Sequence, residues 1–449
     1  MLFAAYAATL GLGAAPGERY SPREVHYLMS AESVVSDGDL DLRDEYATSA
    51  WRRFTRVPPR PTAALSRGRL VEPQGIGFPL LIAPAYALGG ATAVELFLAA
   101  VTALAFVLAA ALARRLVPEP WASAAALVAG LSPPALAAAT AVSPEPAGAA
   151  LLAAAALGAL AVRDRPRLGL AFAAAAPVAV LPWLALELAA GGAVCALAIA
   201  RWVGRRARWW IALLALDSVL SSGVAYLTLN DGLYGGLTPY APATAPGGPT
   251  GASSVGEALE RAPRLLGLLA DRDAGLLRWA PFMALALYAV WLLWRSRRER
   301  LAAAVPGQRD VEVAAGFIAA ICGVQLVVAA FLAPSLHGTW GPARLLVPVM
   351  PLAAALCAWG LRFAPRTGSV LAALTLAGSA WLLIGLRVGS GGLAPLRGDV
   401  PWGGAQDVLP RFTGGALGAG EAVLLAAAVA GIAALLVREW RAWRGLPAG

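Results

Sequence analysis

Residues 149–161 read AALLAAAALGALA, an uncharged apolar stretch that is closely followed by Arg163, Arg165 and Arg167. A membrane-spanning helix needs about 20 predominantly apolar residues, and segments of this kind recur along most of the chain. The whole sequence of 449 residues is 59% hydrophobic and 14% charged, with a mean hydropathy of +0.66. Soluble domains contain about 25% charged residues. The composition therefore excludes a water-soluble globule and predicts an all-α polytopic membrane protein.

Apolar stretches of sufficient length predict about twelve membrane-spanning helices. The expected spans are residues 1–15, 92–113, 121–141, 146–162, 168–182, 184–200, 209–228, 276–294, 312–333, 343–361, 368–386 and 419–437. We expect them to form one domain over residues 1–449. Three longer connections, 16–91, 229–275 and 387–418, would lie together on one side of the membrane.

The distribution of arginine predicts the orientation of the spans. Every second connection is rich in arginine, namely at Arg114, Arg115, Arg163, Arg165, Arg167, Arg201, Arg205, Arg206, Arg208, Arg295, Arg297, Arg298, Arg300, Arg309, Arg362, Arg366, Arg438, Arg441 and Arg444. The short connections at 142–145, near 183 and at 334–342 contain none. By the positive-inside rule both termini are cytoplasmic, and the three long segments lie outside.

The charge balance also excludes several classes of site. The formal charge of +9 follows from the arginines that set the topology, so we expect no nucleic-acid partner. The basic residues include no lysine, which excludes a Walker A phosphate loop and a pyridoxal Schiff base. Cys195, Cys322 and Cys357 are far apart in apolar stretches and indicate neither a disulfide framework nor a metal site.

The first outer segment contains a candidate catalytic group. Ser21 and Glu24 have the spacing of a capping box, so a short helix at the membrane surface is expected to begin here. Glu24, His26 and Tyr27 follow one another within a turn of that helix. A carboxylate beside a histidine at the membrane–water boundary can act as a general base. The alternative is a solvated helix in which Glu24 serves only as a capping residue.

Two further residues on the outer side suggest binding of an anion. Arg344 lies just inside the outer end of its span, where a guanidinium faces a cavity or a partner, or snorkels to lipid headgroups. A guanidinium suits a phosphate because it can donate two parallel hydrogen bonds. His337 lies nearby in sequence. A metal site built on His26 and His337 would also need a carboxylate in a shared cavity. The prediction therefore names no metal ligands and no required cofactor, with a divalent metal as the open alternative.

Four sequence stretches together resemble a known family. They are PREVHYLMSAESVVSDGDLDLRDEY at 22–46, PQGIGFPLLIAPAYALGG at 73–90, DRDAGLLRWAP at 271–281 and WGPARLLVPVMP at 340–351. In this order they resemble the GT-C membrane glycosyltransferases related to protein O-mannosyltransferases and the lipid A aminoarabinose transferase. The resemblance implies a GT-C-like fold with a long first outer loop that carries short interfacial helices.

The resemblance also implies site residues, with one departure. Where the family has an acidic pair before a Pro-His-Tyr-Leu sequence, this chain has Arg23, Glu24 and Val25. An acid of this loop, often the first of the pair, is the catalytic carboxylate of the family. Glu24 can take that role only if the second position serves, and Asp39, Asp41, Glu18 and Asp37 are the substitutes. The binding residues implied are His26, Tyr27, His337 and Arg344.

The function implied is transfer of a sugar from a polyprenyl-phosphate donor to an acceptor on the outer face of the cytoplasmic membrane. The acceptor would be a glycan, a lipid or a protein. The cytoplasmic connections are too short for a nucleotide-sugar domain, which also favours a lipid-linked donor. One alternative is a transporter or flippase of lipid-linked envelope intermediates, for which Asp217 and Glu187 are the intramembrane candidates. The other is a catalytically inactive member of the family that acts in envelope assembly.

Overall fold

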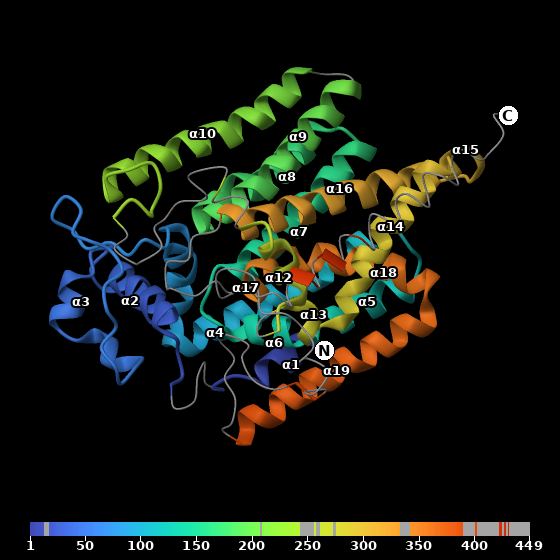
Figure 1. Cartoon of the computed structure of the whole chain (residues 1–449). Helices are drawn as coiled ribbons and strands as arrows, with labels where there is room; N and C mark the ends of the chain where they lie inside the picture. Colours follow the sequence, from blue (N-terminus) through green and yellow to red (C-terminus); the bar gives the residue numbers. More distant parts are fainter. Residues whose placement is uncertain are drawn as a thin grey trace.

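The computed structural model describes residues 1–12, 18–206, 209–242, 261–272, 275–332 and 342–388, together with residues 256, 400, 401, 422, 423, 426, 427 and 430. This part of the chain is helical and contains no strand (Figure 1). The helices are α1 (Leu2–Ala7), α2 (Pro22–Ser36), α3 (Arg43–Ala47), η1 (Ala50–Arg53), α4 (Gly77–Ala113), α5 (Trp121–Gly130), α6 (Pro133–Thr140), α7 (Glu145–Asp164), α8 (Leu168–Leu184), η2 (Leu186–Leu188), α9 (Ala189–Arg206), α10 (Trp209–Tyr234), α12 (Arg264–Ala270), α13 (Leu276–Trp279), η3 (Pro281–Met283), α14 (Ala284–Arg298), α15 (Leu301–Ala304), α16 (Gln308–Val327), η4 (Val328–Leu332), α17 (Pro342–Leu346), η5 (Val347–Val349), α18 (Met350–Phe363) and α19 (Pro365–Val388).

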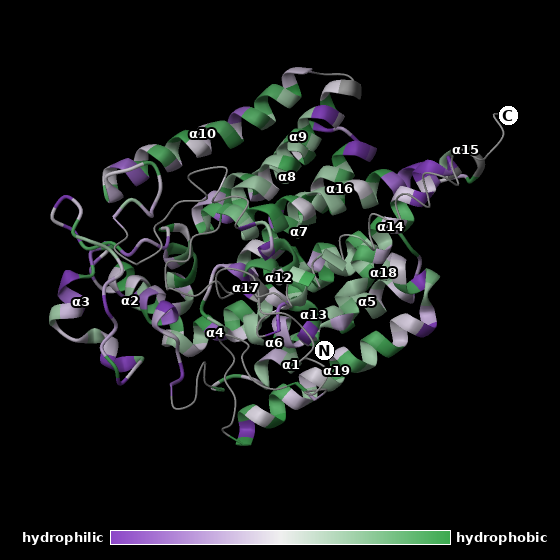
Figure 2. Cartoon of the chain, in the orientation of Figure 1, coloured by the Kyte–Doolittle hydropathy of each residue, from purple (hydrophilic) through white to green (hydrophobic). Residues whose placement is uncertain are grey.

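Seven helices of the described part are long and apolar enough to cross a membrane. They are Gly77–Ala113, Glu145–Asp164, Leu186–Gly204, Trp209–Tyr234, Gln308–Leu332, Arg344–Phe363 and Pro365–Val388. Together α5 and α6 meet the same criterion, although the chain bends by 62° between them. Hydrophilic residues gather around α2 and α3 at one end of the bundle and around α14 and α15 at the other (Figure 2). The predicted all-α polytopic membrane protein is thus confirmed.

The boundaries of several helices differ from those expected. The helix expected over 92–113 begins at Gly77, inside the predicted outer segment 16–91. Its backbone is non-helical at Gly89 and Gly90, and Gly90 has a φ of 62°. Glycine adopts positive φ without steric cost, so this pair lets the helix change direction just before the expected span begins.

Three expected spans are shorter in the structure or lie outside it. Of residues 1–15, α1 covers six. In the expected span 276–294 the continuous helix α14 begins only at Ala284 and continues to Arg298, because a turn of 3-10 helix that begins at Pro281 interrupts the chain before it. The expected span 419–437 lies almost entirely outside the described residues. The described part therefore contains seven or eight helices of spanning length, where about twelve were expected for the whole chain.

The degree of burial distinguishes helices in the centre of the bundle from helices at its periphery. The most hydrophobic windows of the Arg344–Phe363 and α7 spans are 89% and 72% buried, whereas those of α10 and α19 are 22% and 28% buried. Small residues allow the inner helices to approach closely: a Cβ atom added at Gly360 of α18 would lie 2.6 Å from the carbonyl oxygen of Leu285 in α14. Close approach through glycine and alanine is the expected means of helix association in a membrane.

This contact gives a stability prediction. Gly360→Leu should destabilise the protein by about 1–3 kcal/mol, because the new side chain overlaps a backbone atom that cannot rotate away. A matched control is Gly323→Leu in α16, where nothing lies within 4 Å of the added Cβ. Thermal unfolding of the two variants in the same detergent measures the difference. Equal unfolding temperatures would contradict the close packing of α14 against α18.

The segment between α1 and α4 is built on α2. Its Ser21 and Glu24 form the predicted capping box, and Pro22 occupies the first helical turn. The ring of Tyr27 packs edge-to-face against Phe78 of α4, with 4.7 Å between the centroids. These contacts fix the N-terminal end of α2 beside the membrane-spanning helices.

Candidate active site

Three charged side chains from distant parts of the sequence meet beside the start of α7. Glu145 is the first residue of α7, Arg23 lies in the first turn of α2 and Arg344 lies in α17. The Nη1 atom of Arg23 is 3.1 Å from Oε1 of Glu145, and the Nε atom of Arg344 is 3.5 Å from the same oxygen. We call these three residues the arginine–glutamate cluster.

The carboxylate at the centre of the cluster is buried, and only one of its two oxygens is paired. The Glu145 side chain is 9% exposed. Its Oε2 atom is buried and accepts no hydrogen bond from any residue in the described part of the chain. The side chain of Arg344 is 38% exposed, so the cluster opens to solvent on that side. The start of α7 adds the positive end of a helix dipole, which stabilises negative charge there.

Arg23 also contacts Tyr27, one of the residues expected at the site. Its Nη2 atom donates a hydrogen bond to the Tyr27 hydroxyl at 3.1 Å, and its guanidinium lies 5.4 Å from the centre of the Tyr27 ring. Burial raises the pKa of Tyr27 to about 12, although the positive charge of Arg23 acts in the opposite direction. Tyr27 is therefore a neutral hydroxyl near neutral pH and holds Arg23 against Glu145.

Glu24 lies next to the cluster, but both of its carboxylate oxygens are engaged by the backbone. Oε2 accepts from the N–H of Ser21 at 2.7 Å, which closes the capping box. Oε1 accepts at 2.9 Å from the N–H of Val142, in the turn that leads into α7. Burial raises the pKa of Glu24, while these N–H groups act to lower it. Glu24 thus ties the start of α2 to the turn that carries Glu145.

A second acid lies close to the same guanidinium. Burial acts to lower the pKa of Arg23, but its interactions with Tyr27, Glu145 and Glu187 raise it. Oε1 of Glu187 accepts from the Tyr240 hydroxyl at 3.0 Å, and Oε2 is buried with no hydrogen-bond partner among the described residues. The starts of α7 and η2 therefore each contribute a carboxylate to the surroundings of Arg23.

Other predicted site residues lie away from the cluster. The Nδ1 atom of His26 is 3.4 Å from Nε2 of Gln74 and 3.9 Å from Oε2 of Glu72, and burial lowers the pKa of the imidazole. His26 therefore joins α2 to the segment before α4. The other predicted histidine, His337, lies outside the described residues.

Asp39 and Asp41 organise the loop after α2. Asp39 accepts hydrogen bonds from the Ser33 hydroxyl and from the N–H of Asp41, both at 3.0 Å. Asp41 pairs with Arg43, 2.7 Å away, and accepts from the N–H of Leu70. Ser33 lies about 13 Å along the helix from Glu24 at the usual helical rise. The structure therefore does not bring these two acids together with Glu24.

Two members of the cluster had not been predicted as site residues. Glu145 stands in the sequence SPEPAG, which is typical of a helix start, and local pattern offered no other signal. Arg23 was noted only as the residue that replaces an expected acid. Each finds its partner more than a hundred positions away, and such contacts leave no trace in local spacing.

Comparison with known proteins gives a structural match only. No known protein family and no curated protein matches the sequence. Among solved structures, the chain is similar to ArnT from Cupriavidus metallidurans in the apo state, with a TM-score of 0.52 and 15% sequence identity over 86% of this chain and 68% of that chain. The chain has a GT-C-like fold. A second structure, ArnT bound to undecaprenyl phosphate, gives a TM-score of 0.47 at 15% identity over 88% of this chain and 73% of that chain. The resemblance drawn from the sequence is confirmed at the level of the fold.

The cluster combines a proton acceptor with a group that can bind an anion. A buried carboxylate with a free oxygen can accept a proton. A partly exposed guanidinium can stabilise an oxyanion as it forms. Among the described residues, the cluster has no set of three side chains that could hold a metal ion; the one such group there is Asp37, Asp44 and Glu45, at the end of α2 and in α3.

Proposed function

We propose that the protein transfers a sugar from a polyprenyl-phosphate donor to an acceptor on the outer face of the cytoplasmic membrane. The observation that carries the proposal is the buried Glu145 carboxylate held between Arg23 and Arg344. The GT-C-like fold supports it. A polyprenyl tail can lie among apolar helices while its phosphate reaches the half-exposed Arg344 at the end of a span. The acceptor is a glycan, a lipid or a protein.

The chemistry of the cluster supports assignment of the general base to Glu145. In the proposed step an acceptor hydroxyl gives its proton to Oε2 of Glu145, and its oxygen forms a bond to the anomeric carbon of the sugar. The bond from that carbon to the phosphate oxygen breaks, and its electron pair leaves with the polyprenyl phosphate. Arg344 stabilises the negative charge on the departing phosphate through charge-assisted hydrogen bonds.

The contacts of Glu24 support a positioning role for that residue. Its two carboxylate oxygens accept N–H bonds from Ser21 and Val142, so a proton transfer to Glu24 would compete with bonds that hold the loop. Glu145 has an oxygen without such a commitment. We therefore propose Glu145 as the base, with Glu24 setting the position of the turn before α7. The contacts of Asp39 and Asp41 support a role in the loop rather than in the transfer.

The orientation of α7 supports action on the outer face. This helix has 20 residues, or about 30 Å of length, which matches the hydrocarbon thickness of a bilayer. Glu145 is at one end, and Arg163 is at the other end, next to Arg165 and Arg167. Because cytoplasmic loops carry the excess of arginine, the end with Glu145 is proposed to face outward.

A donor test addresses the proposal directly. Membranes that contain the protein are supplied with radiolabelled polyprenyl-phosphate sugars, one at a time, and the label is followed into acceptors. We expect label to move from the lipid to an acceptor without any nucleotide sugar, and not to move in membranes that lack the protein. A strict need for a nucleotide sugar, with the lipid donor inert, would overturn the proposal. Label that crosses the bilayer while still attached to its lipid would instead identify a flippase.

A further inference from the structure

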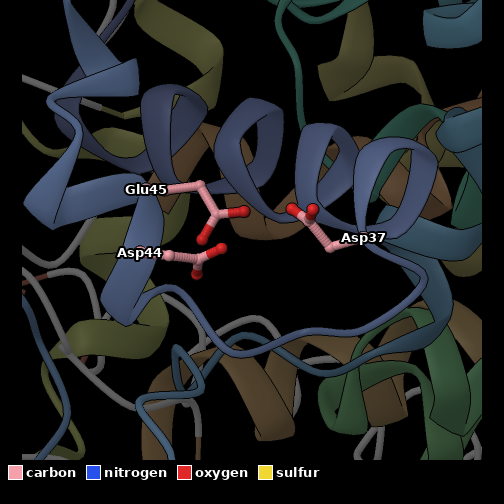
Figure 3. Close-up of side chains that lie close together, drawn as sticks. All are labelled: Asp37, Asp44 and Glu45. Carbon is pink, nitrogen blue, oxygen red and sulfur yellow. The ribbon is translucent and has the colours of Figure 1, made fainter.

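Three carboxylates gather at the corner between α2 and α3, at the far end of α2 from the arginine–glutamate cluster. Asp37 caps the C-terminus of α2, while Asp44 and Glu45 lie in the first turn of α3. One oxygen from each side chain can be chosen so that all three lie within 4.8 Å of one another. The close-up shows the three carboxyl groups turned toward a common space (Figure 3).

Glu45 is the unusual member of the group. The residue is 4% exposed, whereas Asp37 and Asp44 are exposed. Its Oε2 atom is buried and has no hydrogen-bond partner within the described part of the chain. A buried carboxylate oxygen without a partner costs free energy in a folded protein. In Figure 3 this carboxyl group points at Asp44 and Asp37, so its missing partner belongs in the space between them.

Two nearby arginines form their ion pairs with acids outside the group, although the charge of Arg43 also acts on Asp44. Arg43 pairs with Asp41, with 2.7 Å between the atoms, and Arg53 pairs with Glu32. Three acids therefore share one corner of the loop, and a bound cation would offset their repulsion.

We propose that Asp37, Asp44 and Glu45 bind a calcium ion. The donors are all carboxylate oxygens, without the histidine or cysteine that zinc prefers. Two Ca–O bonds of about 2.3–2.6 Å on opposite sides of an ion place oxygens about 4.6–5.2 Å apart, so oxygens that all lie within 4.8 Å of one another fit around a calcium ion. Magnesium usually keeps several waters and binds through one or two carboxylates, whereas calcium accepts a flexible set of carboxylates. The exposure of Asp37 and Asp44 leaves room for water to complete the coordination.

The ion would hold the end of α2 and the start of α3 in fixed positions relative to each other. Because α2 carries Arg23 and Glu24 at its other end, a fixed corner stabilises the outer loop as a unit. The inference does not depend on sugar transfer, since its readouts are binding and stability.

The test uses the full-length protein in detergent, stripped with EDTA and titrated with CaCl₂ at constant ionic strength. Bound ⁴⁵Ca and thermal unfolding are measured together. We expect one high-occupancy ion per chain in the range of about 10⁻⁴–10⁻³ M found for extracellular modules, and a rise of several degrees in the unfolding temperature. Equal concentrations of MgCl₂ should give a much smaller rise.

Substitutions distinguish calcium binding at this site from nonspecific binding of calcium to other acidic residues. Glu45→Gln should abolish the calcium-dependent rise and should unfold no earlier than the parent without calcium, because it removes a repelled charge. Asp37→Asn, at an exposed position, should weaken binding by at least tenfold. Asp231→Asn is the matched control: this exposed acid pairs with Arg67 outside the group and should leave the response unchanged. No calcium response in the parent, an equal response in Glu45→Gln, or an equal response to magnesium would overturn the proposal.

Discussion

Glu145→Gln is expected to slow sugar transfer by about 10²–10⁴-fold at saturating donor, with donor binding largely retained. Glutamine keeps the shape of the side chain and one oxygen for Arg23 and Arg344, but it accepts a proton far less readily. The loss should therefore fall on the chemical step. Single-turnover assays with labelled lipid donor measure that step, and Glu299→Gln, an exposed acid paired with Arg295, is the control for the same chemical change.

Glu24→Gln provides the discriminating comparison. An amide has one oxygen, so either the Ser21 or the Val142 N–H loses its acceptor, which should cost about 1–3 kcal/mol of stability. Turnover of the folded protein should fall much less than in Glu145→Gln. If instead Glu24→Gln lost 10²-fold or more and Glu145→Gln stayed near the parent, the base would be Glu24, as the spacing of the sequence first suggested.

Arg344→Ala should reduce turnover by about 10²–10³-fold, the loss typical when one group that stabilises a developing oxyanion is removed. The affinity for the lipid donor should fall as well, because the guanidinium is the exposed cation of the cluster. Arg344→Lys should recover part of the loss, since it keeps the charge but not the two-pronged contact. The turnover rate and the Michaelis constant for the lipid donor separate the two effects.

Arg362→Ala is the control for loss of an arginine, because Arg362 lies in the last turn of α18, away from the cluster. Similar kinetics for Arg344→Ala and Arg362→Ala would mean that Arg344 only snorkels to lipid headgroups. That was the alternative left open by the sequence.

The membrane helices and the start of α2 could be predicted because their signals are local. Hydropathy over about 20 residues identifies a span, and Ser21 with Glu24 identifies a capping box within four positions. The break in α4 is also visible locally, as the adjacent pair Gly89 and Gly90. The helical turns before it were nevertheless predicted to be a loop. The start of α14 was predicted too early because Pro281 was given too little weight.

The centre of the site could not be predicted in this way. Glu145 is notable only because Arg23 and Arg344 reach it from α2 and α17, and no local pattern encodes that meeting. Sequence spacing grouped Glu24, His26 and Tyr27 within one turn of helix. Residues two positions apart point about 200° apart around a helix, so His26 turns toward Glu72 and Gln74 while Glu24 turns toward Val142.

The deep burial of α18 has a consequence for how the chain enters the membrane. Lipid contacts little of this helix, because α4, α5, α14 and α16 pack around it. These four helices precede α18 in the sequence, and α19, which also packs against it, follows, so most of its protein neighbours have already been synthesised when it leaves the ribosome. When α18 enters the membrane, it can therefore pack directly against helices that are already inserted. Truncated chains that end before α18 would expose to lipid the surfaces of α4, α5, α14 and α16 that this helix covers.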